Sequence, residues 1–250
     1  MPATRQTSTT TPETARAFAT THWSVVLAAG ERTSPDAVAA LNELCRTYWY
    51  PLYAYLRRQG HRVHDAQDLT QSFLAHLLEK NRLQRLHPSK GKFRSFLLVS
   101  LKNFLANEWD RQQALKRGAQ FAVISLDDAT GEGRFAREPS HEVTPDKAFE
   151  KSWALMLLDA VLAKVRRDYA AEGKGPLFDA LQVYLSGDRG SAPYAETAAK
   201  LNLTEGAVKM SVLRMRRRFG ELLRAEIANT VSDPAEIDEE IRCLFAAVSG

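Results

Sequence analysis

Residues 194–220, YAETAAKLNLTEGAVKMSVLRMRRRFG, predict two helices joined by one sharp turn. The first helix carries small Ala198 and Ala199, so another helix can approach it closely. Asn202 stands where the turn needs a positive φ, which Asn tolerates better than most residues. Thr204 can cap the second helix by accepting a hydrogen bond from its first turn. This layout is typical of a DNA-binding helix-turn-helix.

The second helix of this pair has an apolar face and a basic face. At about 100° per residue, its inward stripe consists of Val208, Val212, Met215 and Phe219. The outward face and its flanks hold the candidate DNA contacts Lys209, Met210, Leu213, Arg214, Arg216 and Arg217. Arginine can bond guanine or phosphate, and apolar side chains can contact a thymine methyl. The alternative is a structural helical hairpin with a basic exterior.

Charge is distributed in blocks along the 250 residues. Residues 201–220 hold five Lys/Arg against one Glu, and residues 92–118 hold six against two acidic residues. Residues 221–250 reverse the balance, with two Lys/Arg against seven Asp/Glu. This pattern indicates a polyanionic partner. It also raises the hypothesis that an acidic helix over 233–248 covers the basic recognition face, with simple core packing as its alternative.

Several functional classes find no support in the sequence. The two cysteines, Cys45 and Cys243, have no paired spacing, which argues against a disulfide scaffold or a zinc finger. The Thr-rich start and the absence of a long apolar run predict a cytoplasmic protein without membrane contact. No phosphate-binding Gly loop or nucleophile motif occurs, so we expect neither an enzyme nor a cofactor. His61, His64 and Asp68 are the one candidate metal set, and chance spacing explains them better.

Elsewhere, apolar residues recur at three- and four-residue steps and predict further helices. The predicted helices cover a short segment in 18–30, then 35–59, 64–80, 93–116, 149–173 and 176–187, and a last one from about Ser232. The predicted core stripes are Leu41, Leu44, Cys45, Tyr48, Leu52, Tyr55 and Leu56, then Ala66, Leu69, Phe73 and Leu77, then Phe93, Phe96, Leu97, Leu101, Phe104 and Leu105.

The stretch 118–146 is rich in Gly, Pro, Asp and Ser, which is typical of a linker. The sequence therefore predicts an all-α fold of two small helical domains joined by a flexible linker. The expected boundaries are a partly disordered N-terminal extension over 1–34, a helical domain over 35–118, a linker over 119–147, a helix-turn-helix domain over 148–225 and an acidic C-terminal helix over 226–250.

Three motifs follow one another in a recognisable order. They are DAQDLTQSFLAHLLE (65–79), FRSFLLVSLKNFLANEWDRQ (93–112) and ETAAKLNLTEGAVKMSVLRMRRRF (196–219). Together they resemble bacterial RNA polymerase sigma factors, specifically the extracytoplasmic-function (ECF) type of the sigma-70 family. In that family the first motif looks like the polymerase-binding helix, and the second resembles the helix that recognises and helps melt the −10 promoter element. The third resembles the domain that reads the −35 element.

The resemblance implies a sigma region 2-like bundle and a region 4-like domain, with core RNA polymerase and promoter DNA as partners. An anti-sigma factor or another regulatory protein is a further candidate partner. The implied polymerase contacts are Asp65, Asp68, Leu69, Gln71 and Phe73. The implied −10 contacts are Lys102, Asn103, Asn107 and Arg111, and the basic loop 81–92 is a candidate for contact with single-stranded DNA.

The implied function is promoter-specific transcription initiation. Two alternatives stay open. One is a stand-alone helix-turn-helix transcriptional regulator, in which 35–118 form a sensor or dimerisation bundle. The other is an adaptor whose basic helix binds an acidic protein.

Overall fold

The computed structural model describes residues 26, 29, 35–79, 83, 91–114, 143–185 and 193–249, and these residues form helices and short connections with no strand. The predicted all-α class is therefore confirmed. The first half contains α2 (Pro35–Arg58), α3 (Val63–Glu79) and α4 (Phe93–Ala114). The second half contains α6 (Pro145–Ala171), α7 (Gly175–Leu181), α8 (Tyr194–Leu201), α9 (Glu205–Ala228) and α10 (Ile237–Ser249), with the 3-10 turns η3 (Gln182–Tyr184) and η4 (Pro234–Glu236).

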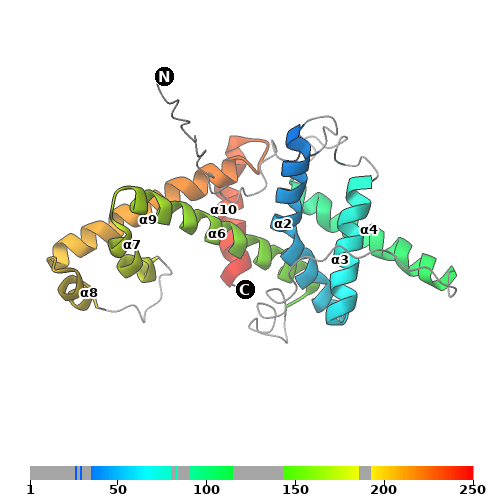
Figure 1. Cartoon of the computed structure of the whole chain (residues 1–250), viewed down its shortest axis with the longest axis horizontal. Coiled ribbons are helices and arrows are strands. Elements are labelled where there is room, and N and C mark those ends of the chain that lie inside the picture. The colour runs from blue at the N-terminus through cyan, green and yellow to red at the C-terminus, as the bar shows by residue number, and fades with distance from the viewer. Residues whose placement is uncertain are drawn as a thin grey trace, which may run out of the picture.

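Helix α2 is the central helix of the first bundle. It continues through Pro51, and residues 47–56 are all buried. A helix that is buried on every side needs neighbours on every side, and α3 and α6 both pack along it (Figure 1). The expected single stripe leaves out Trp49, Tyr50 and Tyr53, whose rings bury the remaining faces.

The predicted stripes do face the core. Their buried members are Leu44, Tyr48, Leu52, Tyr55, Leu56, Ala66, Phe73, Leu77, Phe93, Leu97, Leu101 and Phe104, while Leu41, Cys45, Leu69, Phe96 and Leu105 are partly buried against the same core. Aromatic contacts link the helices: the Tyr48 and Phe93 rings meet edge to face, and Tyr48 stacks on Phe149 of α6. The first bundle therefore extends into the second half of the chain.

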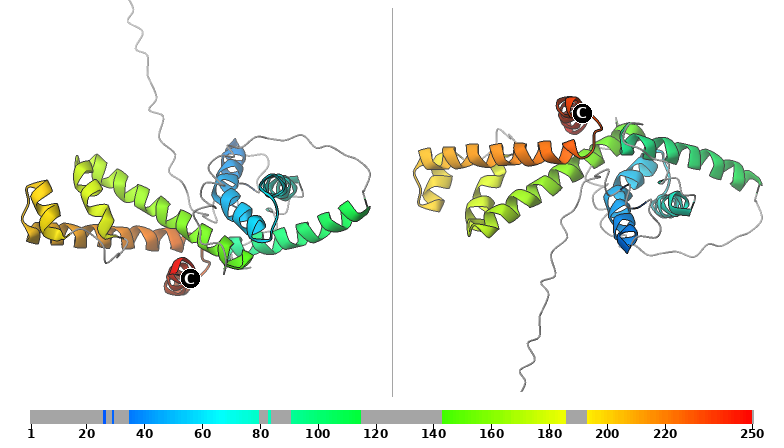
Figure 2. Two further views of the ribbon diagram at one scale, coloured as in Figure 1. Left: turned by 90° about the horizontal axis from the view of Figure 1, so that it is seen from below. Right: turned by 90° about the horizontal axis from the view of Figure 1, so that it is seen from above.

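Two hydrophobic clusters form the core of the described chain. The larger cluster joins α2, α3 and α4 to the beginning of α6, the end of α9 and α10. The smaller cluster joins the end of α6 to α7, η3, α8 and the beginning of α9. Since α6 and α9 each contribute to both clusters, the two cores share two long helices (Figures 1 and 2). The expected domain boundaries stay predictions.

The helix after Thr204 is longer than predicted. Two short helices were expected around residue 202, but α9 has 24 residues and passes through Gly220. A glycine in a helix interior costs about 1 kcal/mol relative to alanine. Burying a large apolar side chain gains about 1.5–3 kcal/mol, and Leu223 and Ile227, both buried, lie beyond this glycine. Tertiary packing therefore carries the helix past it.

Helix α10 packs against α6 and α9 and presents Leu244 to the core, which is the core-packing alternative. Asp233 accepts a hydrogen bond from Ala235 N and caps η4, which leads into α10. The hypothesis that this helix covers the recognition face is wrong for this structure. The outward residues Leu213 and Arg217 remain exposed, because α10 lies against the far half of α9 (Figure 2).

Some predictions fall outside the described residues. These are most of the extension over 1–34 and of the linker over 119–147, as well as the end of the predicted 93–116 helix. Within the extension, Val26 and Ala29 are helical and buried in the larger cluster. At the linker's end, Thr144 caps α6 by accepting from Lys147 N. Within the described ranges, no helix combines the length and apolar character that crossing a bilayer requires.

Candidate nucleic-acid interface

The turn between α8 and α9 has the predicted geometry. Asn202 has φ 53° and ψ 44°, the left-handed conformation, and is the one non-glycine residue with positive φ among those described. Its N–H donates to the Ala199 carbonyl at 3.3 Å, and Leu203 N donates to Ala198 O at 2.9 Å. The Thr204 hydroxyl accepts from Ala207 N at 3.2 Å and caps α9. These bonds satisfy the end of α8 and fix the direction in which α9 leaves the turn.

The smaller cluster supports the first half of α9. Val208, Val212 and Met215 are buried in it, as predicted, and Phe219 is partly buried. In the same cluster, the ring of Tyr184 of η3 stacks on the ring of Tyr194 of α8, with centroids 4.8 Å apart. The Tyr184 hydroxyl also bonds the buried Thr197 hydroxyl at 2.7 Å. Since α8 is anchored at both ends, the exposed side of α9 has a fixed orientation relative to it.

The exposed side of α9 is both apolar and cationic. We define the recognition face as Met210, Leu213, Arg214 and Arg217. Met210 is 50% and Leu213 60% exposed, so both apolar side chains are available to a partner. Arg214 is exposed and has no ion pair with any described residue. Arg217, whose side chain is 81% exposed, pairs with Glu221 at 3.2 Å.

Lys209 lies beside the recognition face. Its ammonium group bonds Glu205 at 2.6 Å and lies 5.7 Å from the centre of the Tyr194 ring. The hydrogen bond from Lys209 to Glu205 raises the pKa of this exposed lysine. Lys209 is therefore cationic and close to the turn between the two helices.

Two other arginines of α9 bond within the protein. Arg216 donates from Nε at 3.2 Å and from Nη2 at 2.6 Å to the carbonyl of Tyr184, the last residue of η3. Arg218 donates to Asp168 of α6 at 2.7 and 2.8 Å. Arg216 was among the predicted DNA contacts, but its guanidinium group already donates to the Tyr184 carbonyl. Its helical position alone could not reveal a carbonyl 32 residues away.

On α3, the predicted polymerase contacts divide by exposure. Asp65 and Asp68 are exposed, and Leu69 and Gln71 are half-buried next to them. The prediction that Phe73 contacts the polymerase is wrong, because Phe73 is only 1% exposed and lies 5.6 Å from the ring of Phe104. Its place in the inward stripe already pointed to the core.

On α4, three of the predicted −10 contacts, Lys102, Asn103 and Asn107, are exposed. We define the α4 face as Val99, Asn103 and Asn107, all exposed. Lys102 beside them bonds Asp146 of α6 at 2.5 Å, and this hydrogen bond raises the lysine pKa. Arg111 belongs to α4, but its side chain lies outside the described residues.

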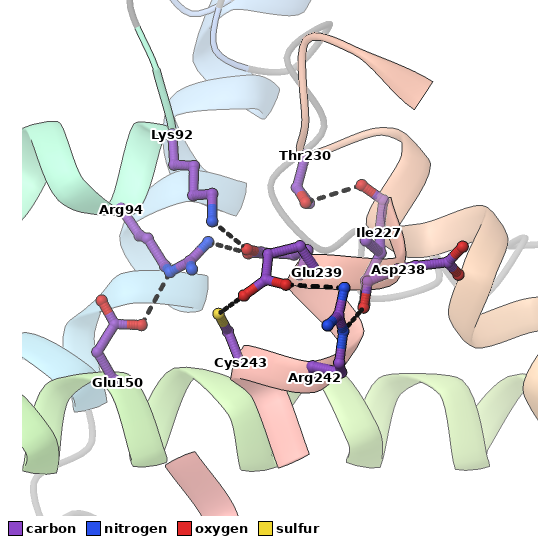
Figure 3. Close-up of polar contacts among 10 residues, drawn as sticks. Lys92, Arg94, Glu150, Ile227, Thr230, Asp238, Glu239, Arg242 and Cys243 are labelled. Atoms are coloured by element: carbon purple, nitrogen blue, oxygen red, sulfur yellow. Dashed lines mark hydrogen bonds and ion pairs between the residues drawn. The ribbon is translucent and has the colours of Figure 1, made fainter. Parts of the chain in front are cut away.

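A buried ion cluster joins the beginning of α4 to α10 (Figure 3). Glu240, with 0% of its side chain exposed, bonds both Lys92 and Arg94. Arg94 also bonds Glu150 at 2.8 Å and lies 4.2 Å from the centre of the Trp153 ring. Burial alone would lower the pKa of Arg94, but the hydrogen bonds and charges of Glu240 and Glu150 outweigh burial and raise it.

This cluster was not predicted, and its one signal in the sequence is the charge contrast between 92–118 and 221–250. Lys92 was expected in a loop that contacts single-stranded DNA, and here it is bound to Glu240. The rest of that loop, apart from Leu83 and Gly91, lies outside the described residues. For metals, the described part of the chain contains no group of three or more His, Cys, Asp or Glu side chains that could hold an ion.

Helices α2, α3 and α4 overlap a match to a known family. Residues 44–115 fit the family model described as Sigma-70 region 2. The match spans less than a third of the chain, and we call residues 44–115 region 2 after the family model that they resemble. This match covers α3 and α4 and most of α2, and it supports a sigma factor role in promoter recognition with RNA polymerase. Neither the curated proteins nor the solved structures contained a match to the chain.

Proposed function

We propose that the chain is a sigma factor of the ECF type, which binds core RNA polymerase and directs promoter-specific transcription initiation. The observation that carries the proposal is the combination of two features on one chain. One is the region 2 domain over 44–115, and the other is the exposed recognition face of α9. A regulator that only binds DNA needs the second feature and has no use for the first.

Helix α3 of region 2 is the proposed polymerase-binding helix. Exposed Asp65 and Asp68, with Leu69 and Gln71 half-buried beside them, suit docking on a basic surface with an apolar edge. Asp65 lies in the first turn, where a carboxylate also stabilises the helix dipole. Asp68 lies beyond that turn, so its charge is available to a partner without this structural role.

The pair α8–α9 is the proposed helix-turn-helix for the −35 element. Its second helix would enter the major groove with the recognition face towards the bases. Arg214 is the first candidate for a guanine contact, because no described residue engages it in an ion pair. Met210 and Leu213 would cover thymine methyl groups, which explains their exposure.

Asn103 and Asn107 of the α4 face are the proposed contacts to the melted −10 element, with Lys102 as a phosphate contact. Asparagine amides can bond the edges of unpaired bases, and a lysine neutralises backbone charge. The proposed role is recognition and positioning, so it requires no cofactor. We expect the protein to act in the cytoplasm with the polymerase.

Binding to purified bacterial core RNA polymerase tests the docking helix. Asp68→Arg should abolish co-purification with the core enzyme while leaving helical circular dichroism unchanged. Glu236→Arg makes the same charge change on the exposed turn η4 and should bind as the unmodified protein does. Full core binding by Asp68→Arg would contradict the docking assignment. Tight binding of a DNA palindrome without any affinity for the core enzyme would favour a stand-alone regulator instead.

A further inference from the structure

Two long helices connect the two hydrophobic clusters without a break. Along α6, Phe149 to Val161 pack in the larger cluster and Val165 packs in the smaller one. Along α9 the order is reversed, with Val208 to Met215 in the smaller cluster and Leu223 to Ile227 in the larger. The two helices are therefore antiparallel, and Phe219 and Leu222 of α9 contact both clusters.

Helix α10 lies across the point where this helix pair meets region 2 (Figure 2). Leu244 is its apolar anchor and is 1% exposed. Glu240 is its polar anchor and bonds Lys92 and Arg94 at the beginning of α4. Figure 3 shows Arg94 between α10 and Glu150, so this one guanidinium joins α4, α6 and α10.

The ion cluster can fix an orientation that apolar packing alone leaves adjustable. Apolar surfaces tolerate small sliding movements, whereas a buried carboxylate must keep its cationic partners or carry a large desolvation cost. Glu240 has two such partners and is itself fully buried. A relative movement of α4 and α10 would separate these charges, so the cluster opposes that movement.

Both candidate DNA surfaces are exposed while this packing is intact. The α4 face includes Val99, which is 58% exposed, and the recognition face includes Leu213, which is 60% exposed. Figure 1 shows α4 near one end of the long axis and the start of α9 near the other, with α6 between them. The packed arrangement therefore presents both surfaces at once, separated by the α6–α9 pair.

We propose that Glu240 is a positioning residue that, with α6 and α9, holds the α4 face and the recognition face at one fixed separation. The consequence for DNA is a requirement for one spacing between the two promoter elements. One added base pair moves an element by about 3.4 Å along the helix axis and turns it by about 35°. A rigid protein cannot follow that change, whereas two domains on a flexible tether can. This consequence for promoters rests on the proposed function, but the fixed separation does not.

Distance measurement in the free, full-length protein tests the fixed separation. Nitroxide labels at Ala106 of α4 and Glu196 of α8, both exposed, measure the separation of the two helices that carry the DNA surfaces, in a Cys45→Ala, Cys243→Ser background. Double electron–electron resonance should give one narrow distance distribution. Glu240→Gln should broaden it by about twofold or more, since neutralising the carboxylate removes the charges that oppose sliding.

The matched control is Glu239→Gln, on the exposed side of the same helix, where the partners of the carboxylate among the described residues are Arg242 and Cys243. It should keep the narrow distribution. A broad distribution in the unmodified protein, or an equally narrow one in Glu240→Gln, would overturn the proposal. If Glu240→Gln loses its helical circular dichroism, the milder Lys92→Gln replaces it, because Arg94 still bonds the carboxylate. Loss of one of the two cations should then broaden the distribution part of the way, and a distribution as narrow as that of Glu239→Gln would overturn the proposal.

A promoter series tests the consequence for DNA. Run-off transcription with core polymerase should decrease by about tenfold or more when the spacing between the two elements changes by about two base pairs. Glu240→Gln should tolerate the same change better than Glu239→Gln does. Activity that is insensitive to spacing in the unmodified protein would overturn this inference alone. No transcription at any spacing, with a narrow distance distribution, would instead overturn the proposed function.

Discussion

Glu240 of α10 forms an ion pair with Arg94 of α4, although 146 residues separate them in the sequence. The carboxylate is fully buried, and Lys92 supplies its second cation. Removing one partner from such a pair is strongly destabilising, because it leaves an uncompensated buried charge. Helix α10, in the acidic C-terminal segment, is therefore ion-paired with region 2. This contact lies at the opposite end of α9 from the recognition face.

Low pH should weaken the ion pairs of Glu240 with Arg94 and Lys92. Burial raises the pKa of the Glu240 carboxyl, but hydrogen bonds from Arg94 and Lys92 and their charges outweigh burial, so the net pKa lies below the ordinary value of 4.5. A lowered pKa contributes stability that is present above the unfolded-state value and is lost as the pH falls through the folded-state value. We expect the free energy of unfolding to decrease below about pH 4.5.

Urea denaturation at a series of pH values measures this decrease. Glu240→Gln should show a shallower decrease in the same pH range, because glutamine cannot take up the proton. Glu239→Gln, which leaves the cluster intact, should follow the unmodified protein. An equally steep acid dependence in Glu240→Gln would assign the effect to other carboxylates.

The turn at Asn202 should tolerate glycine and reject branched side chains. Its φ of 53° suits asparagine and glycine, whereas an ordinary L residue in this region costs about 1–2 kcal/mol. We expect Asn202→Gly to unfold at nearly the same urea concentration as the unmodified protein. Asn202→Val should be less stable by about 1–2 kcal/mol. Equal stability of the two variants would contradict the left-handed turn.

Deleting residues 232–250 should destabilise the protein without improving its DNA binding. The deletion removes Leu244 from the core and leaves Lys92 and Arg94 without the Glu240 carboxylate. The recognition face stays as it was, because α10 does not cover it. A thermal melt should show a lower transition temperature, while fluorescence anisotropy with promoter DNA should show no gain in affinity. Tighter DNA binding would restore the masking hypothesis.

Local chemistry made much of this fold predictable. The turn at Asn202, the cap at Thr204 and the inward stripe from Val208 depend on residues within one or two helical turns, so the sequence pattern contains them. The length of α9 beyond Gly220 was missed because distant residues supply the packing that sustains it. The contacts of Glu240 with Arg94 and of Arg216 with Tyr184 were missed for the same reason. The error at Phe73 came from assigning one side chain to both the core and a partner.

Arg214→Ala tests the recognition face. If Arg214 contacts a base, the substitution should weaken binding to the specific promoter by about 1–3 kcal/mol and relax the preference at one base pair. Arg242→Ala, which removes an exposed arginine from α10, should leave binding unchanged. Titrations at several salt concentrations separate the two roles. A uniform loss on all sequences with a shallower salt dependence would make Arg214 a phosphate contact.

Run-off transcription by core RNA polymerase on genomic fragments tests the central claim most directly. We predict transcripts from discrete start sites that require both the core enzyme and this protein, and that disappear with Asp68→Arg. The absence of any transcript that depends on the protein, together with tight DNA binding by the protein alone, would contradict the claim.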